Sequence, residues 1–216
     1  MLLVGNVLRR LATVSTCLPH ANCWRCEKLL DCEREKFFCG SCQHIQPPVK
    51  CVNYFQYLDQ PVSFDLDLVS LATHFKNLQK QLHPDRFTNR SNDEQNYSAQ
   101  QSSLVNKAYS TLSNALPRAL YLLKLYGKPL TEVKGQSTDP EFLAEMLELN
   151  ERLADCESMD DVKKMGRENK AVLHRLQQEL SGAFDEKNIE KARDIVIRMK
   201  FYVSLEQKVH SKLGFA

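Results

Sequence analysis

The chain has 216 residues, of which 43% are hydrophobic and 26% are charged, and its formal net charge is +2. This length gives room for one large domain or two small ones, and no apolar run approaches the roughly 18 residues of a membrane span. The small net charge offers no general attraction to nucleic acid. We therefore expect neither a membrane nor a nucleic acid as a partner.

Residues 1–22 have the composition of a mitochondrial presequence. They contain Arg9 and Arg10 but no acidic residue, among leucine, valine, serine and threonine. A secretory signal peptide is the alternative, but the arginines follow the first apolar stretch, and no long apolar run comes after them. We expect the protein to reside in the mitochondrial matrix, and the sequence leaves a cytosolic pool open.

Residues 23–50 contain two Cys-x-x-Cys pairs that are separated by twelve residues. Two turns that each present two thiolates supply the four ligands of a tetrahedral, closed and therefore structural zinc site. Local disulfides are one alternative, but a reducing matrix favours a metal. A redox-active pair is the other, but it needs a βαβ context that this segment lacks. We predict a zinc-ribbon-like module with one zinc ion, bound by Cys23, Cys26, Cys39 and Cys42.

Residues 51–126 have the pattern of a helical hairpin. Apolar residues recur at helical spacing over Leu68–Leu82, and a second helical stretch begins near Gln95. Between them, Pro84 disfavours a helical conformation at the preceding residue and ends the first helix. The loop then presents His83 and Asp85, next to a basic face of the first helix.

This arrangement resembles the J-domain, the module that stimulates ATP hydrolysis by DnaK-type (heat shock protein 70) chaperones. The resemblance rests on the His83-Pro84-Asp85 tripeptide, on a short apolar segment at 53–58 and on the helical sequence of residues 103–112. The alternative is a proline-terminated helix whose His and Asp only cap the loop. The resemblance implies a chaperone-binding surface made of Lys76, Lys80, His83, Pro84, Asp85 and Arg86.

A turn-forming linker at 127–138 precedes a bundle over residues 139–216. Asp139 and Pro140 are typical of a helix start, as are Ser158 for a second helix and Asp185 for a third that runs to about Leu213. Three long helices with short connections predict an antiparallel three-helix bundle, so the fold class is all-α.

The first helix of this bundle has more apolar surface than one core stripe needs. At about 100° per residue, Leu143 and Leu147 fall beside the core stripe and are bordered by carboxylates. In the last helix Phe201 points away from the core stripe, with Ile197 and Leu205 beside it. Periodicity leaves two readings open, an interaction surface or broad internal packing, because each helix of such a bundle touches two others.

A J-domain followed by an acidic three-helix bundle resembles the HscB/Jac family of iron–sulfur co-chaperones, and the four cysteines and presequence resemble its animal mitochondrial members. The resemblance implies an adaptor that stimulates a mitochondrial heat shock protein 70 chaperone and delivers the iron–sulfur scaffold protein to it, and that is not itself an enzyme. Ala144 and Asp155 are smaller than the residues of bacterial relatives. A general J-protein for unfolded clients and a thiol oxidoreductase are the rival functions. The implied scaffold-binding residues are Leu143, Leu147, Glu148, Glu151, Asp155 and Phe201.

Overall fold

The computed structural model describes residues 20–31, 33–49, 52–130 and 139–214. Within these ranges the chain is almost entirely helical, as predicted, with one small hairpin of strands β1 (His20–Asn22) and β2 (Leu29–Asp31). None of the helices in these ranges is both long and apolar enough to cross a membrane. Residues 1–19 of the predicted presequence lie outside the described part of the chain. Residues 20–22, also assigned to it, form β1.

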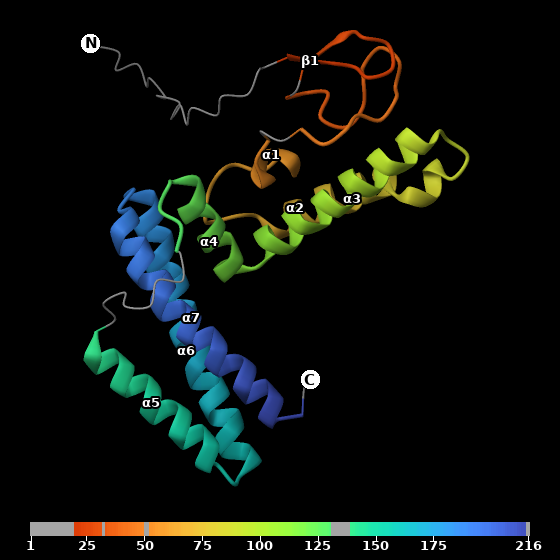
Figure 1. The fold of residues 1–216 in the computed structure, drawn as a ribbon. Coiled ribbons are helices and arrows are strands. Elements are labelled where there is room, and N and C mark those ends of the chain that lie inside the picture. The colour runs from red at the N-terminus through yellow and green to blue at the C-terminus, as the bar shows by residue number, and fades with distance from the viewer. Residues whose placement is uncertain (1–19, 32, 50–51, 131–138, 215–216) are drawn as a thin grey trace, which may run out of the picture.

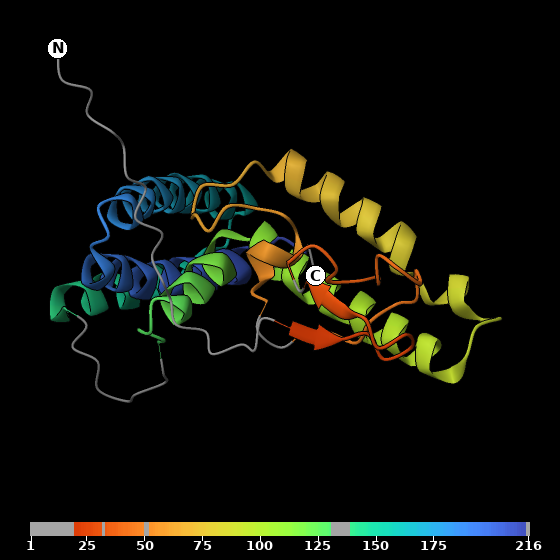
Figure 2. The same cartoon turned by 90° about the horizontal axis from the view of Figure 1, so that it is seen from above.

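The module around the cysteines is held together by short backbone pairings. Strands β1 and β2 are antiparallel, with Ala21 opposite Leu30, and a single bridge pairs Phe38 with Ile45. In Figure 1 and Figure 2 this module lies against the long helical hairpin that follows it in the chain.

The hairpin consists of α2 (Leu68–Leu82) and α3 (Asn92–Ser113), preceded by the short α1 (Tyr54–Tyr57). Helix α3 begins three residues before the predicted Gln95, because Ser91 and Glu94 form a capping box that bonds the free amides of the first turn. The two helices meet through an aromatic stack of Phe75 on Tyr109, whose ring centroids are 4.1 Å apart. Core residues of the hairpin are Leu71, Leu82, Val105, Ala108 and Leu112.

The second arm of the molecule is a three-helix bundle, as predicted, formed by α5 (Pro140–Asp155), α6 (Met159–Asp185) and α7 (Ile189–Lys212). The expected start of the last helix at Asp185 was wrong. Helix α6 continues through Asp185, the chain turns at Lys187 with a φ of +56°, and Asn188 caps α7. The capping amide of Asn188 accepts from the backbone N–H of Lys191, which makes it the stronger start signal.

Helix α4 (Ala115–Leu125) joins the two arms. It begins at Ala115 and has Pro117 in its first turn, where a proline is tolerated. Phe184 of the bundle packs on Phe64 and Tyr126, at centroid distances of 5.7 and 6.1 Å. One core therefore runs from the hairpin into the bundle and fixes the angle between the arms that Figure 1 shows.

Candidate functional site

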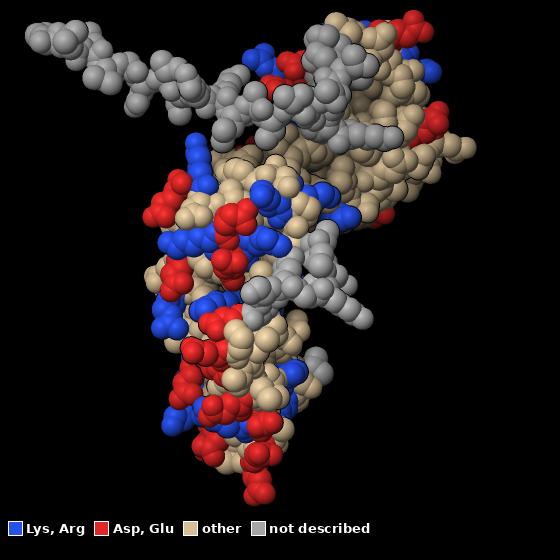
Figure 3. Space-filling view, turned by 60° about the vertical axis from the view of Figure 1, so that its left-hand side comes forward, with Lys and Arg blue, Asp and Glu red and all other residues tan. Residues whose placement is uncertain are grey.

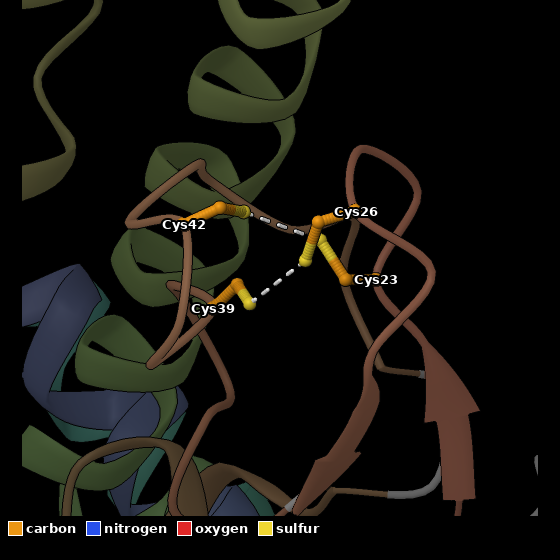
Figure 4. Close-up of side chains that lie close together, drawn as sticks. All are labelled: Cys23, Cys26, Cys39 and Cys42. Atoms are coloured by element: carbon orange, nitrogen blue, oxygen red, sulfur yellow. Dashed lines mark hydrogen bonds between the residues drawn. The ribbon is translucent and has the colours of Figure 1, made fainter.

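The four cysteine sulfurs converge on one point between two loops (Figure 4). All four Sγ atoms lie within 4.8 Å of one another, with 3.6 Å between Cys23 and Cys42 and 3.8 Å between Cys26 and Cys39. Four sulfurs at the usual Zn–S distance of about 2.3 Å lie about 3.8 Å apart at the corners of a tetrahedron. The sulfur positions therefore fit a single tetrahedral metal ion, whereas a disulfide needs about 2.05 Å.

The two cysteine pairs lie in two separate turns that have the same local geometry. The backbone N–H of Glu27 donates to the oxygen of Cys23 at 2.9 Å, and that of Gln43 donates to the oxygen of Cys39 at 2.8 Å. Both Glu27 and Gln43 have a positive φ, +59° and +58°. Inside the second turn, a Cβ on Gly40 would approach Glu35 Oε1 to 2.6 Å, so a larger residue would displace the carboxylate that accepts from the Gly40 N–H.

The surroundings of the sulfurs affect how readily each thiol loses its proton. Burial disfavours the Cys23 thiolate, but backbone N–H groups of Cys26 and Arg25 outweigh it and lower its pKa to about 6. The N–H of His44 favours the Cys42 thiolate. Burial and the neighbouring sulfurs prevail and raise the pKa of Cys42 to about 12. A divalent ion bound between the four sulfurs would stabilise all four thiolates together.

The cysteine module has a second set of contacts that the sequence patterns did not indicate. The buried amide of Gln46 donates to Cys23 Sγ at 3.3 Å. Gln101, buried on α3, donates to the backbone oxygens of Gln46 and Lys36 at 3.0 and 3.1 Å. Trp24 packs edge-on against Tyr97 of α3 at 5.5 Å. The metal-ligand loops are thus bonded directly to the hairpin.

The loop after α2 places the predicted tripeptide at the far end of the hairpin. His83 has the extended backbone that Pro84 imposes (φ −60°, ψ 130°), and Pro84 starts a 3-10 helix, η1 (Pro84–Phe87). His83 Nδ1 accepts from the backbone N–H of Asp85 at 3.3 Å and lies 3.5 Å from its carboxylate. Both side chains are exposed, so they remain available to a partner.

Two buried contacts hold this loop in shape. Phe87 is buried in the core, and Ser98 of α3 donates from its hydroxyl to the oxygen of Leu82 at 2.7 Å. Arg86 Nη1 donates to the oxygen of Lys80 at 3.0 Å, which keeps the guanidinium against the end of α2. The structure leaves every predicted chaperone-binding side chain exposed on this end of the hairpin: Lys76, Lys80, His83, Pro84, Asp85 and Arg86.

The apolar strip predicted on α5 lies outside the core. Leu143 and Leu147 are 43% and 61% exposed, whereas their neighbours Phe142 and Met146 are each 4% exposed. Phe201 of α7 is 37% exposed and its ring packs edge-on against Phe142 at 5.4 Å. Phe201 is therefore anchored to α5 and still partly open to solvent.

The carboxylates predicted beside this strip are also exposed. Glu148, Glu151 and Asp155 all lie on the solvent side of α5. Figure 3 shows acidic side chains gathering toward the bottom of the view, where α5 passes into α6. For Leu205 the structure decides between the two readings in favour of internal packing: it is 3% exposed and packs with Leu153, Val162, Met165 and Val209, because α7 faces both of its neighbours at that level.

Comparison with known proteins agrees with this arrangement. A family model described as the HSCB C-terminal oligomerisation domain matches residues 138–210. The iron-sulfur cluster co-chaperone protein HscB of Homo sapiens is 36% identical over 194 residues, which cover 89% of this chain and 83% of that protein. The protein of the same name from Mus musculus is 34% identical and covers 87% of this chain and 80% of its own length.

Solved structures give the same result. The crystal structure of human co-chaperone protein HscB has a TM-score of 0.85 to this chain and covers 89% of it and 98% of its own chain, at 36% identity. Chaperone HscB from Vibrio cholerae has a TM-score of 0.66 at 31% identity and covers 74% of this chain and 96% of its own. This chain therefore belongs to the HscB family of iron–sulfur cluster co-chaperones.

Proposed function

We propose that the protein is an adaptor with two ends. The loop after α2 stimulates ATP hydrolysis by a heat shock protein 70 chaperone, and the exposed strip of α5 and α7 holds the iron–sulfur scaffold protein. The proposed outcome is transfer of the cluster to recipient proteins. Membership of the HscB family supports this function, and the observation that carries it is that the arms present two separate, chemically different surfaces.

The chaperone end is basic. Lys76, Lys80 and Arg86 are exposed beside the tripeptide, and they attract an acidic surface of the chaperone. Such attraction mainly raises the rate of encounter and weakens as salt is added. In this proposal ATP is hydrolysed on the chaperone, and His83, Pro84 and Asp85 shift the chaperone toward hydrolysis, so the adaptor is not an enzyme.

The scaffold end is apolar with an acidic border. Leu143, Leu147 and Phe201 provide apolar area that is removed from water on binding, the usual source of affinity at the centre of an interface. Glu148, Glu151 and Asp155 select a partner with basic residues around an apolar patch.

Joining the two ends in one chain raises the effective concentration of scaffold near the chaperone. The shared core through α4 keeps the arms at a fixed angle, so that both partners are held in one relative position. We also propose that the metal is zinc, because four thiolates in tetrahedral arrangement are its commonest structural site. The basic, acid-free stretch at 1–22 supports import into the mitochondrial matrix.

The loop is tested with Asp85→Asn, which removes one charge and keeps the side-chain shape. We expect this variant to lose stimulation of the chaperone in a single-turnover ATP hydrolysis assay, while its affinity for the scaffold stays unchanged. Asp93→Asn is the matched control, because Asp93 is exposed in the first turn of α3 and lies outside the tripeptide. Full stimulation by Asp85→Asn would refute the proposed role of the loop.

A further inference from the structure

A groove of about 390 Å³ lies where the second cysteine turn meets the loop after α2. One wall is formed by Cys42, Gln43 and His44, and another by residues that follow the tripeptide. The groove therefore combines the metal module with the end of the hairpin. The complete lining is Phe38, Cys42, Gln43, His44, Gln81, Arg86, Phe87, Arg90 and Glu94.

The two walls are held in a fixed relation by the contacts beneath them. The indole N–H of Trp24 donates to the oxygen of Ile45 at 2.6 Å, directly after the second turn, and its ring packs on Tyr97 of α3. Gln101 of α3 donates to the next residue, Gln46. The second turn accordingly stays in place relative to the loop when the loop meets a partner.

The groove has the chemistry of a site for negative charge. Arg86 and Arg90 are exposed and line it, and the amides of Gln43 and Gln81 are exposed beside them. Glu94 is the one acid among the lining residues, and it is buried. Its carboxylate already accepts from the N–H and hydroxyl of Ser91, at 3.3 and 3.1 Å. With two arginines against one carboxylate, the lining keeps a net positive charge.

We propose that this groove takes an acidic segment of the chaperone, so that the second cysteine turn is part of the docking surface. The inference rests on the proposed function, since it needs the loop to dock on the chaperone. Continuity supports it, because Arg86 follows Asp85 directly and lines the groove as well. The cysteine module then has a binding role as well as a structural one, because it forms one wall of the surface that meets the chaperone.

Opposite charge changes at Gln43 test this inference. Gln43 is exposed, and its amide donates to the oxygen of Gly40 at 3.0 Å. Both Gln43→Lys and Gln43→Glu keep a long side chain. Lysine can still donate to the Gly40 oxygen and glutamate cannot, so loss of this bond alone would weaken only Gln43→Glu. An acidic partner, by contrast, also makes Gln43→Lys act at a lower concentration than the wild type.

The measurement is the concentration of metal-loaded, full-length protein that gives half-maximal stimulation of ATP hydrolysis. We expect Gln43→Lys to lower this concentration by about threefold and Gln43→Glu to raise it by about threefold, the size of effect that an exposed ion pair has. The difference should shrink as salt is added. Gln178→Lys and Gln178→Glu, exposed on α6, are the matched controls and should change nothing.

The outcomes separate this inference from the function on which it rests. Equal half-maximal concentrations for both Gln43 variants, or shifts in the same direction, would overturn the inference and leave the stimulation by the wild-type protein intact. Absence of stimulation by the wild-type protein would overturn the proposed function, and the inference with it.

Discussion

The side-chain amide of Gln101, on α3, donates a hydrogen bond of 3.0 Å to the backbone oxygen of Gln46 in the cysteine module. Gln46 in turn donates to Cys23 Sγ at 3.3 Å. A continuous path of buried hydrogen bonds therefore leads from a cysteine of the cluster to the long helix of the hairpin. This path holds the module against the hairpin.

Because of these hydrogen bonds, we expect replacement of Gln101 to lower the stability of the protein. Gln101→Leu would leave the buried backbone oxygens of Gln46 and Lys36 without this donor, which costs about 1–3 kcal/mol of unfolding free energy. Chemical denaturation measures this loss. Gln100→Leu, at the exposed neighbouring position, is the control and should stay within about 0.5 kcal/mol of the wild type. Equal effects of the two variants would contradict the path.

Removal of the metal should loosen the module and spare most helices. Trp24 is the chain's single tryptophan, and it packs between His44 and Tyr97. We expect chelation, or Cys39→Ser, to shift its fluorescence toward that of a solvated indole, while helical circular dichroism changes little. Cys156→Ser, outside the cluster, should leave fluorescence and metal content unchanged. Unaltered fluorescence after complete metal loss would show that the module folds without it.

Two adjacent residues of α5 should respond in opposite ways. Leu147→Ala should weaken scaffold binding and leave stability within about 0.5 kcal/mol, because Leu147 is 61% exposed. Met146→Ala removes a side chain that is 4% exposed and should cost about 2–5 kcal/mol of unfolding free energy. Calorimetric titration with the scaffold and chemical denaturation give the two readouts.

The control is a leucine-to-alanine change at an exposed position outside the proposed scaffold surface. Leu68 is 49% exposed on α2, so Leu68→Ala should bind the scaffold as the wild type does. Similar losses of affinity from Leu147→Ala and Leu68→Ala would mean that the strip on α5 is not specific.

The contact between α5 and α7 should weaken in alkali. Burial, and then the neighbouring Glu145 carboxylate that accepts its hydroxyl at 2.9 Å, raise the pKa of Tyr202 to about 12. An unfolded tyrosine has a pKa of about 10, so the folded state favours the protonated form. This contribution to stability is complete below pH 10 and is lost as the pH rises toward 12.

Tyr202→Phe isolates this effect. The variant should lose less unfolding free energy than the wild type between about pH 10 and 12, as measured by denaturation at each pH. Tyr57, whose pKa burial raises to about 12, keeps a residual slope in both proteins. If unfolding free energy fell equally steeply with pH in the two proteins, the titration of Tyr202 would not contribute to the loss of stability.

Repeated local signals made the helices and the candidate sites predictable. Helical periodicity placed Leu143 and Leu147 beside the core stripe of α5, and both are exposed in the structure. The cysteine spacing predicted the cluster because two turns are enough to build it.

Contacts between distant segments could not be predicted in this way. Gln46 and Gln101 are polar and follow no period, so their burial depends on where the module meets α3. Leu205 is buried although its helical angle placed it beside Phe201, because the width of a helix's core face depends on how its neighbours cross it. The groove beside Gln43 has the same origin, since its walls come from segments that only the fold brings together.

The two-ended function can be measured in single-turnover ATP hydrolysis by a mitochondrial heat shock protein 70 chaperone, with this protein and the purified scaffold added separately and together. We expect stimulation by this protein alone and a further rise when the scaffold is present. Stimulation that is indifferent to the scaffold would contradict the two-ended adaptor and leave a general J-protein. No stimulation at all would mean that His83-Pro84-Asp85 only ends a helix and does not act on the chaperone.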